Sequence, residues 1–389
     1  MKKILLIVLL SLFVTGCSGE DLHYIDPVDT TADGNVADAD GAGWIPIPVT
    51  VTADGLSGMN TRFIETKNAF VFCDNRGTVR TAYISKATGT VSPLCDDPLC
   101  SHPDDGVDDM CAVVGNLFTF STLCYSPDSG RLYFVRPYRL FGMGNDMFLV
   151  LYSVDIDKMD LTVKEHHRFA VGVRLETMQY SDGKLYFTYC DMDDEGNEIL
   201  MLDAYDIKSD KVENITFFED AGTYFTVIGD SIYYSDKSVY TLNRYCITDD
   251  KTEELIPGKP RQQYIVTEDK IYLRDTTSVS VIDTATGDRS ELAVYEENTY
   301  GRAAVTAEGG VYYTLPYLAQ IGDFKGGKLY VCGNGESRVY YDFGDDTYIS
   351  MISAYGDNVF VEVEINDKMQ FARLTEAGDK VACYFFPTL

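Results

Sequence analysis

Seven short aromatic segments recur along this chain, and they constrain its fold more than any other feature. Each begins after a turn containing Gly, Asp or Asn and continues as a strand-like run. The segments are NAFVF (68–72), GRLYF (130–134), GKLYF (183–187), DSIYY (230–234), DKIYL (269–273), GGVYY (309–313) and DNVFV (357–361). Their apolar anchors, from Phe70 to Val359, lie about 40 to 60 residues apart, which is typical of a repeat architecture.

A further pair of strand-like segments follows most of these runs. Apolar and polar residues alternate around hairpin turns in 151–163, 202–215, 240–255, 279–292 and 371–385. Four antiparallel strands in about 40 to 50 residues are typical of a β-propeller blade. We therefore predict an all-β chain with one propeller over residues 44–389. Seven blades fit best, and six or eight are alternatives because the first interval is long.

The N-terminal residues predict export and a lipid anchor. Two lysines, a short apolar run from Ile4 to Val14 and small residues before Cys17 form the pattern of a secretory signal peptide. The apolar run is too short to cross a bilayer. Residues VTGC (14–17) resemble the lipobox of bacterial lipoproteins, in which the cysteine thiol receives diacylglycerol before cleavage. An ordinary secreted protein whose signal ends in cysteine is the alternative.

That resemblance implies a mature chain that begins at Cys17 after loss of residues 1–16. Its acyl chains, of the palmitate type, would hold it at the extracytoplasmic face of the cell membrane, since two chains anchor a protein stably. Residues 17–43 are acidic and poor in apolar side chains, so they predict a flexible tether.

The formal charge of the chain is −29. Such a charge repels nucleic-acid phosphates and anionic headgroups, so we expect no nucleic-acid partner and a monomer in solution. The charge indicates solubility and separation from an anionic envelope. Attraction for cations or basic peptides is the alternative interpretation.

The chain resembles the propeller lipoproteins of Gram-positive bacteria, many of which are known as domains of unknown function. The resemblance rests on the lipobox, the acidic tether and repeated units such as SDGKLYF (181–187) and LYSVD (151–155). The segment PLCDDPLCSHP (93–103) also looks like one that these proteins carry after the first blade. The resemblance implies a propeller fold and a membrane location, and it implies no established activity.

Long insertions are expected at one face of the propeller. The turns between first and second strands and between third and fourth strands are short, as in SDGK (181–184) and IKSD (207–210), and we call their side the turn face. Residues 95–114, 137–146, 190–197 and 316–327 are longer and belong to the opposite side, the loop face. Insertions confined to one face indicate a binding face. We predict that it includes Arg136, Tyr138, Arg139, Asp191, Asp193 and Tyr317.

The first insertion carries a cluster of cysteines with one histidine. Cys95, Cys100, His102 and Cys111 supply three thiolates and an imidazole, a complete tetrahedral ligand set for structural zinc. One or two disulfides, with Cys124 as a candidate partner, are the rival interpretation and the favoured one, because oxidation is expected outside the cytoplasm. Unpaired thiols are the third interpretation.

Two functions of different class are consistent with these patterns. The first is a membrane-anchored binding or scaffold protein whose loop face takes a peptide, a glycan or an envelope protein partner, without any recognisable catalytic residues. The alternative is an envelope-associated hydrolase or lyase with its site at the central funnel, drawing on Asp191, Asp193, Arg136 and Arg139. A propeller fold does not decide between them.

Overall fold

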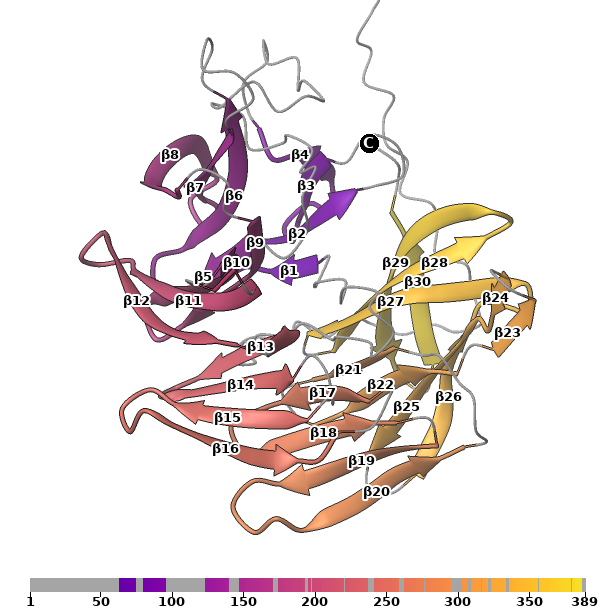
Figure 1. Cartoon of the computed structure of the whole chain (residues 1–389). Coiled ribbons are helices and arrows are strands. Elements are labelled where there is room, and N and C mark those ends of the chain that lie inside the picture. Colours follow the sequence, from indigo (N-terminus) through magenta and orange to yellow (C-terminus); the bar gives the residue numbers. More distant parts are fainter. Residues whose placement is uncertain are drawn as a thin grey trace, which may run out of the picture.

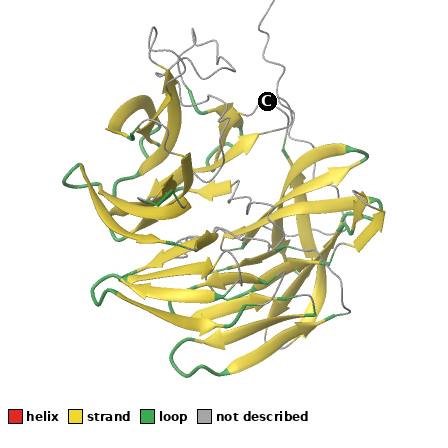
Figure 2. Ribbon diagram, viewed as in Figure 1, coloured by secondary structure: helices red, strands yellow, loops and turns green. Residues whose placement is uncertain are grey.

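A computed structural model describes the greater part of the predicted propeller and shows strands as its only regular elements (Figure 2). The described residues are 63–386 without 75–79, 96–122, 140–146, 171–173, 193–194, 197, 220, 237–240, 259–261, 276, 296–301, 307–308, 316, 321–322, 334–335, 356 and 379. Among these residues no helix is long and apolar enough to cross a membrane. The predicted signal peptide and tether lie outside the described residues.

The strands form seven four-stranded antiparallel sheets, which we call blades 1 to 7. Blades 1 to 3 are β1 (Phe63–Glu65), β2 (Ala69–Asp74), β3 (Arg80–Ser85), β4 (Val91–Pro93); β5 (Leu123–Ser126), β6 (Arg131–Arg139), β7 (Met147–Asp155), β8 (Asp160–Arg168); and β9 (Arg174–Ser181), β10 (Lys184–Met192), β11 (Glu198–Asp206), β12 (Lys211–Phe218). Blades 4 and 5 are β13 (Ala221–Ile228), β14 (Ser231–Asp236), β15 (Leu242–Cys246), β16 (Lys251–Ile256); and β17 (Gln263–Val266), β18 (Lys270–Arg274), β19 (Ser278–Asp283), β20 (Arg289–Val294). Blades 6 and 7 are β21 (Ala303–Val305), β22 (Val311–Thr314), β25 (Lys328–Gly333), β26 (Glu336–Asp342); and β27 (Thr347–Tyr355), β28 (Asn358–Ile365), β29 (Lys368–Ala377), β30 (Lys380–Phe385).

The blades are arranged as a ring, with the first strand of each blade innermost (Figure 1). These first strands contact their counterparts in neighbouring blades: β5 and β13 contact β9, and β17 and β27 contact β21. The all-β, seven-bladed propeller predicted from the repeat is confirmed. The aromatic segments that reveal the repeat are the second strands of the blades, from β2 to β28.

Alternation along these second strands explains how the blades pack. In β18, Ile271 and Leu273 join an apolar cluster with Tyr233 and Leu242 of blade 4. Tyr272, between them, joins a cluster with blade 6. Because successive side chains point to opposite faces of a strand, one apolar run fills the interfaces on both sides of its blade.

Among the described strands none is shared between the first and last blades: blade 1 takes its four strands from the N-terminal side of the propeller and blade 7 takes its four from the C-terminal side. Aromatic packing joins the two blades instead. Phe63 stacks on Phe360 of blade 7 with ring centroids 4.8 Å apart, and it contacts Phe371 edge-on at 5.5 Å. Phe386, which follows β30, lies 5.9 Å from Phe72 of blade 1.

The loop face and the turn face are confirmed by the strand order. The turns that connect first to second strands and third to fourth strands lie at one end of every blade. The long connections 94–122, 140–146, 193–197 and 315–327 all join strands at the other end. The last of them contains a hairpin of its own, β23 (Tyr317–Gln320) with β24 (Asp323–Lys325).

Candidate functional site

The predicted loop-face residues come from three blades. Arg136, Tyr138 and Arg139 lie in β6 of blade 2, Asp191 lies near the end of β10 in blade 3, and Tyr317 begins β23 at blade 6. Asp193 lies outside the described residues. Arg136 is only 4% exposed, with its guanidinium carbon 5.8 Å from the centroid of the Tyr152 ring, whereas Asp191 is exposed and accepts a hydrogen bond from the Met192 amide.

Of the four residues in the cysteine–histidine cluster, only Cys95 lies among the described residues. Cys95 follows β4 and is half-buried, while Cys100, His102 and Cys111 lie outside the described residues. No disulfide joins two described cysteines, and no metal-binding group occurs among the described side chains. Cys124 is buried in β5, and burial raises the pKa of its thiol to about 12. Zinc and disulfides therefore both stay predictions for this cluster.

Two arginines that the sequence analysis did not single out lie close together at the loop face. Arg302 immediately precedes β21, the innermost strand of blade 6, so it lies near the propeller axis. Its Nε donates a 3.0 Å hydrogen bond to the Ser350 carbonyl in β27 of blade 7. Arg274 ends β18 of blade 5 and is 3% exposed. Thus one cation bridges blades 6 and 7, and a second lies nearby in blade 5, hydrogen-bonded to blade 6.

Thr314 of β22 links these two arginines. Its carbonyl accepts a 3.3 Å hydrogen bond from Arg274 Nη2, and its hydroxyl accepts one from the Arg302 amide at 2.9 Å. Its own amide donates to the Arg302 carbonyl at 3.0 Å. Thr314 therefore holds the Arg274 guanidinium through its carbonyl and the Arg302 backbone through its hydroxyl and amide, while the Ser350 carbonyl holds the Arg302 side chain.

Both positive and negative groups surround Arg302 and Arg274. The pKa of Arg274 lies below its ordinary value, first because of burial and further because of the neighbouring positive charge of Arg302. Burial raises the pKa of Tyr348, near the start of β27, while Arg302 opposes that rise and Glu362 adds to it. Arg302 and Glu362 therefore both act on the Tyr348 hydroxyl. Glu362, in β28, is 2% exposed.

The β23–β24 hairpin is attached beside this pair. Gly326, which follows β24, forms a parallel bridge with Tyr348, and its amide donates to the Thr347 carbonyl at 2.8 Å. The next residue, Gly327, has no room for a side chain, since a Cβ there would lie 1.7 Å from Thr347 Oγ1. The insertion of blade 6 is thus held against the innermost strand of blade 7.

A serine, a histidine and an aspartate form a second constellation, between blades 2 and 3. His166 Nε2 lies 2.8 Å from Ser153 Oγ, and His166 Nδ1 lies 3.5 Å from Asp210 Oδ1. The Tyr205 hydroxyl is 2.8 Å from the same Nδ1 and donates to Asp210 Oδ1 at 2.5 Å. Since Tyr205 has one hydroxyl hydrogen, it must accept from Nδ1–H, which leaves Nε2 as acceptor for Ser153.

This constellation does not offer a nucleophile to a substrate. Ser153 is 0% exposed, and its oxygen also accepts a 2.9 Å hydrogen bond from Arg131. Burial lowers the pKa of His166 and so keeps the ring neutral. A neutral ring completes the chain of hydrogen bonds from Arg131 through Ser153, His166 and Tyr205 to Asp210. Nucleophilic catalysis needs access to the hydroxyl as well as the right distances, so the structure supports a polar connection between two blades.

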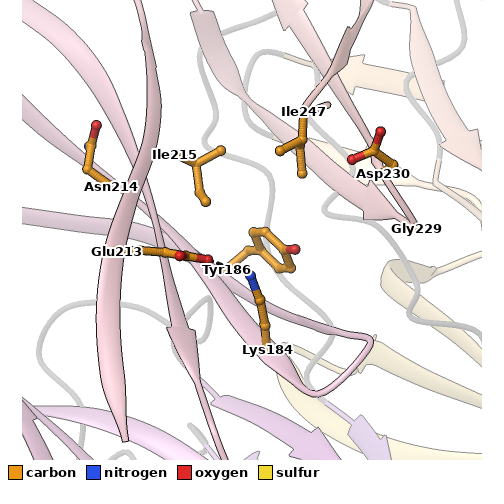
Figure 3. A pocket seen from close by; sticks show the side chains of 8 residues that line it. All are labelled: Lys184, Tyr186, Glu213, Asn214, Ile215, Gly229, Asp230 and Ile247. Carbon is orange, nitrogen blue, oxygen red and sulfur yellow. Dashed lines mark hydrogen bonds and ion pairs between the residues drawn. The ribbon is translucent and has the colours of Figure 1, made fainter. Parts of the chain in front are cut away.

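A pocket of about 490 Å³ lies on the turn face between blades 3 and 4 (Figure 3). Lys184 and Glu213 form an ion pair beside Tyr186, with Ile215 and Ile247 forming the apolar wall. Asp230, on the far side, accepts hydrogen bonds from Cys246 Sγ at 3.3 Å and the Thr248 amide at 3.2 Å. The charged groups of this pocket are therefore already engaged by the protein itself.

A periodic signal could have identified Arg274 and Glu362 from sequence. In the repeated second strand, the residue immediately after each five-residue aromatic segment follows the apolar and aromatic core positions. It is Val135 in blade 2, Thr188 in blade 3 and Ser235 in blade 4, all small or neutral. In blades 5 and 7 the same position holds Arg274 and Glu362. Burying a charged side chain costs free energy, so a charged residue at a buried repeat position indicates that the side chain has a specific role there.

No model of a known protein family matches the chain, and no curated protein does either. Solved structures share its fold. The Pyrococcus horikoshii acylaminoacyl peptidase matches with 14% identity and a TM-score of 0.51, over 85% of this chain and 53% of the peptidase. The β-propeller domain of the Trilobed protease from Pyrococcus furiosus, whose open velcro topology has been described, matches with 13% identity and a TM-score of 0.50, over 85% and 94% of the two chains.

The oligogalacturonate lyase from Vibrio parahaemolyticus matches with 12% identity and a TM-score of 0.52, over 86% of this chain and 87% of that one. The chain therefore spans about half the length of the peptidase and nearly all of the lyase. At such identities these likenesses show the propeller fold and nothing about activity.

Proposed function

We propose that this chain is a membrane-anchored, extracytoplasmic binding protein whose loop face takes a peptide, a glycan or an envelope protein. The observation that carries the proposal is the placement of all four long connections on the loop face, together with the Arg302 and Arg274 pair beneath one of them. A rigid ring that varies at one end is the usual form of a repeat protein that binds partners.

Two features favour binding over catalysis. The Ser153–His166–Asp210 constellation places a histidine 2.8 Å from the serine, but the serine is fully buried and the Tyr205 hydroxyl lies between the histidine and the aspartate. The loop-face arginines supply positive charge and hydrogen-bond donors, which suit the binding of an anionic group. Arginine is enriched at the energetic centres of binding surfaces, where a few anchoring side chains carry most of the affinity.

Shortening the blade 6 hairpin tests the proposal. Tyr317 pairs with Lys325 in β23–β24, so residues 318–324 can be replaced by Asn-Gly, which closes a two-residue turn between them. The Cys17→Ser form of the full chain would be screened for binding to peptides and envelope glycans before and after this change. We expect at least a tenfold loss of affinity for the bound probe.

The matched control is on the turn face. Lys184→Gln and Glu213→Gln together remove the ion pair of the blade 3–4 pocket while leaving the loop face intact. Binding that survives the hairpin replacement but is lost in this double variant would place the site on the turn face and contradict the proposal.

The alternative function, a hydrolase or lyase of the envelope, draws on the solved structures. A peptidase and a lyase are among the proteins that share the fold, and the lyase aligns over nearly its whole length. The alternative predicts turnover of peptides or anionic polysaccharides by the purified chain. Turnover that is abolished by Arg302→Gln would favour this alternative, whereas binding without product formation favours the binding protein.

A further inference from the structure

We propose that Arg302, supported by Arg274, binds a carboxylate group of the ligand at the loop face of blades 5 to 7. The inference rests on the proposed function, because it assigns the chemistry of the ligand that the loop face takes. It is carried by four relationships: the hydrogen bonding of Arg302, the position of Arg274, the engagement of the nearby acids and the attachment of the β23–β24 hairpin.

Arg302 keeps a donor edge available. Its Nε is used by the Ser350 carbonyl, which fixes the guanidinium plane, and the side chain is half-buried rather than fully covered. Among the residues that the structure describes, no carboxylate forms an ion pair with Arg302. A planar guanidinium has five N–H donors, so the Nη atoms can still pair with two oxygens of a carboxylate.

Arg274 acts as a positioning residue and as a second positive charge. Its Nη2 donates to the Thr314 carbonyl, opposite the Thr314 hydroxyl that accepts from the Arg302 amide. Because Arg274 is 3% exposed, its charge lies in a low-dielectric region and is screened less by water than a surface charge. An anion at Arg302 would relieve the repulsion between the two guanidinium groups.

The acid next to Arg274 in sequence is largely engaged elsewhere. Asp275 accepts hydrogen bonds from the amides of Thr277 and Ser278, each at 2.8 Å, and its other oxygen lies 3.9 Å from Arg289. These hydrogen bonds lower the pKa of Asp275 against the opposing effect of burial. Asp275 therefore reduces the positive potential around Arg274 without closing the Arg302 donor edge.

Asp275 and Glu362 favour a ligand group with one negative charge over a group with two. Glu362 raises and Arg302 lowers the pKa of the Tyr348 hydroxyl, so a negative group also lies near this site. A phosphate dianion would meet repulsion from Glu362 and Asp275, while a carboxylate carries one charge spread over two oxygens that match the guanidinium fork. The β23–β24 hairpin is attached next to this site through the bridge between Gly326 and Tyr348.

The test uses the full-length Cys17→Ser chain and two probes that carry carboxylates on different backbones, hexaglutamate and trigalacturonate, measured by isothermal titration calorimetry. Hexaglutamine and inorganic phosphate are the comparison probes. We expect one or both carboxylate probes to bind, and the stronger one identifies peptide or sugar as the source. Arg302→Gln should weaken that binding about 10- to 100-fold, the usual value of a charge-assisted hydrogen-bonded pair.

Two further variants keep the test sharp. Arg302→Lys retains the charge but loses the fork, so it should recover only part of the affinity. Arg244→Gln, which breaks an ion pair with Glu253 in blade 4, is the matched control and should leave affinity unchanged. Absence of binding by both carboxylate probes, equal binding of phosphate, or unchanged affinity in Arg302→Gln would overturn the inference. If hairpin replacement abolishes binding but Arg302→Gln has no effect, the loop face is still the binding face and the carboxylate inference is wrong.

Discussion

The Tyr355 hydroxyl donates a hydrogen bond to the Phe63 carbonyl and so joins the last blade of the propeller to the first. The two residues are 292 positions apart in the chain, and each lies in the innermost strand of its blade. Both are buried among phenylalanines of blades 1 and 7. Since none of the described strands is shared between these two blades, this bond and the aromatic cluster around it join them within the described part of the chain.

Removing that hydroxyl should weaken the closure. Tyr355→Phe leaves the buried Phe63 carbonyl without this donor, and an unsatisfied buried acceptor costs about 1–3 kcal/mol. We expect the free energy of unfolding in urea to fall by that amount. Tyr83→Phe, at a half-buried tyrosine of blade 1, is the control and should change it by less than about 0.5 kcal/mol. Equal effects of the two substitutions would show that the closure does not depend on this bond.

Protonation of His166 should couple stability to pH. Burial holds the pKa of His166 below 6.5, while neighbouring Lys164 and Arg131 lower it further and Asp210 raises it. In the unfolded chain the ring takes up its proton near pH 6.5, and in the folded chain it does so at lower pH. The unfolded state therefore binds more protons between these values, and stability falls as the pH decreases through that window.

The measurement compares the urea midpoint of the wild type and His166→Gln from pH 7.5 to pH 5. His167, whose pKa burial also lowers, contributes in the same direction in both proteins. The wild type should lose stability more steeply on acidification, with a difference in slope of up to about 1.4 kcal/mol per pH unit. Parallel curves for the two proteins would mean that the Ser153–His166–Tyr205 relay does not hold the ring neutral.

Gly327 should be essential for attaching the hairpin. An added Cβ would meet Thr347 Oγ1 at 1.7 Å and the Gly344 carbonyl at 2.4 Å, so Gly327→Ala must displace the start of β27. We expect a loss of about 1–3 kcal/mol in the free energy of unfolding, as for other overpacked sites. Gly310→Ala is the matched control, because its nearest contact would be Thr306 Oγ1 at 3.2 Å. Similar losses in both variants would contradict the close fit at Gly327.

The predicted anchor depends on one thiol. Cys17→Ser should prevent acylation, so the protein should move from the membrane fraction to the soluble fraction and lose labelling by a radioactive fatty acid. Cys190→Ser, at a half-buried cysteine of blade 3, serves as the control for cysteine substitution. A Cys17→Ser protein that stays in the membrane fraction and keeps its label would refute the lipoprotein prediction.

The repeat predicted the fold because each blade contains one second strand whose sequence is constrained on both faces. Ile271, Tyr272 and Leu273 must fill two blade interfaces at once, which produces an aromatic run that stands out from its surroundings. Two of the first strands are too short to carry such a signal. β1 and β21 are three residues each, and their pairing follows only from the position of the neighbouring strand.

The candidate site was harder to predict because its parts are distant in sequence. Arg274, Arg302 and Tyr348 belong to three blades, and they meet because the ring places the loop-side ends of adjacent blades together. Motif spacing cannot reveal such a site. A comparison of equivalent repeat positions could have found Arg274 and Glu362, but Arg302 lies before its strand, outside the repeated run. Arg136 shows the opposite case, since a residue predicted for the surface is buried beside Tyr152.

Site-specific photocrosslinking in cells that make the protein tests most directly whether the loop face binds a partner. A photoreactive phenylalanine would be placed at Asp191 or Tyr317 on the loop face, and at Lys208 or Asp249 in turns of the turn face. We expect a discrete crosslinked envelope component from the loop-face positions and none from the turn-face positions, with the product lost on hairpin replacement. Crosslinks that form only from Lys208 and Asp249, or equally from both faces, would contradict a binding role for the loop face.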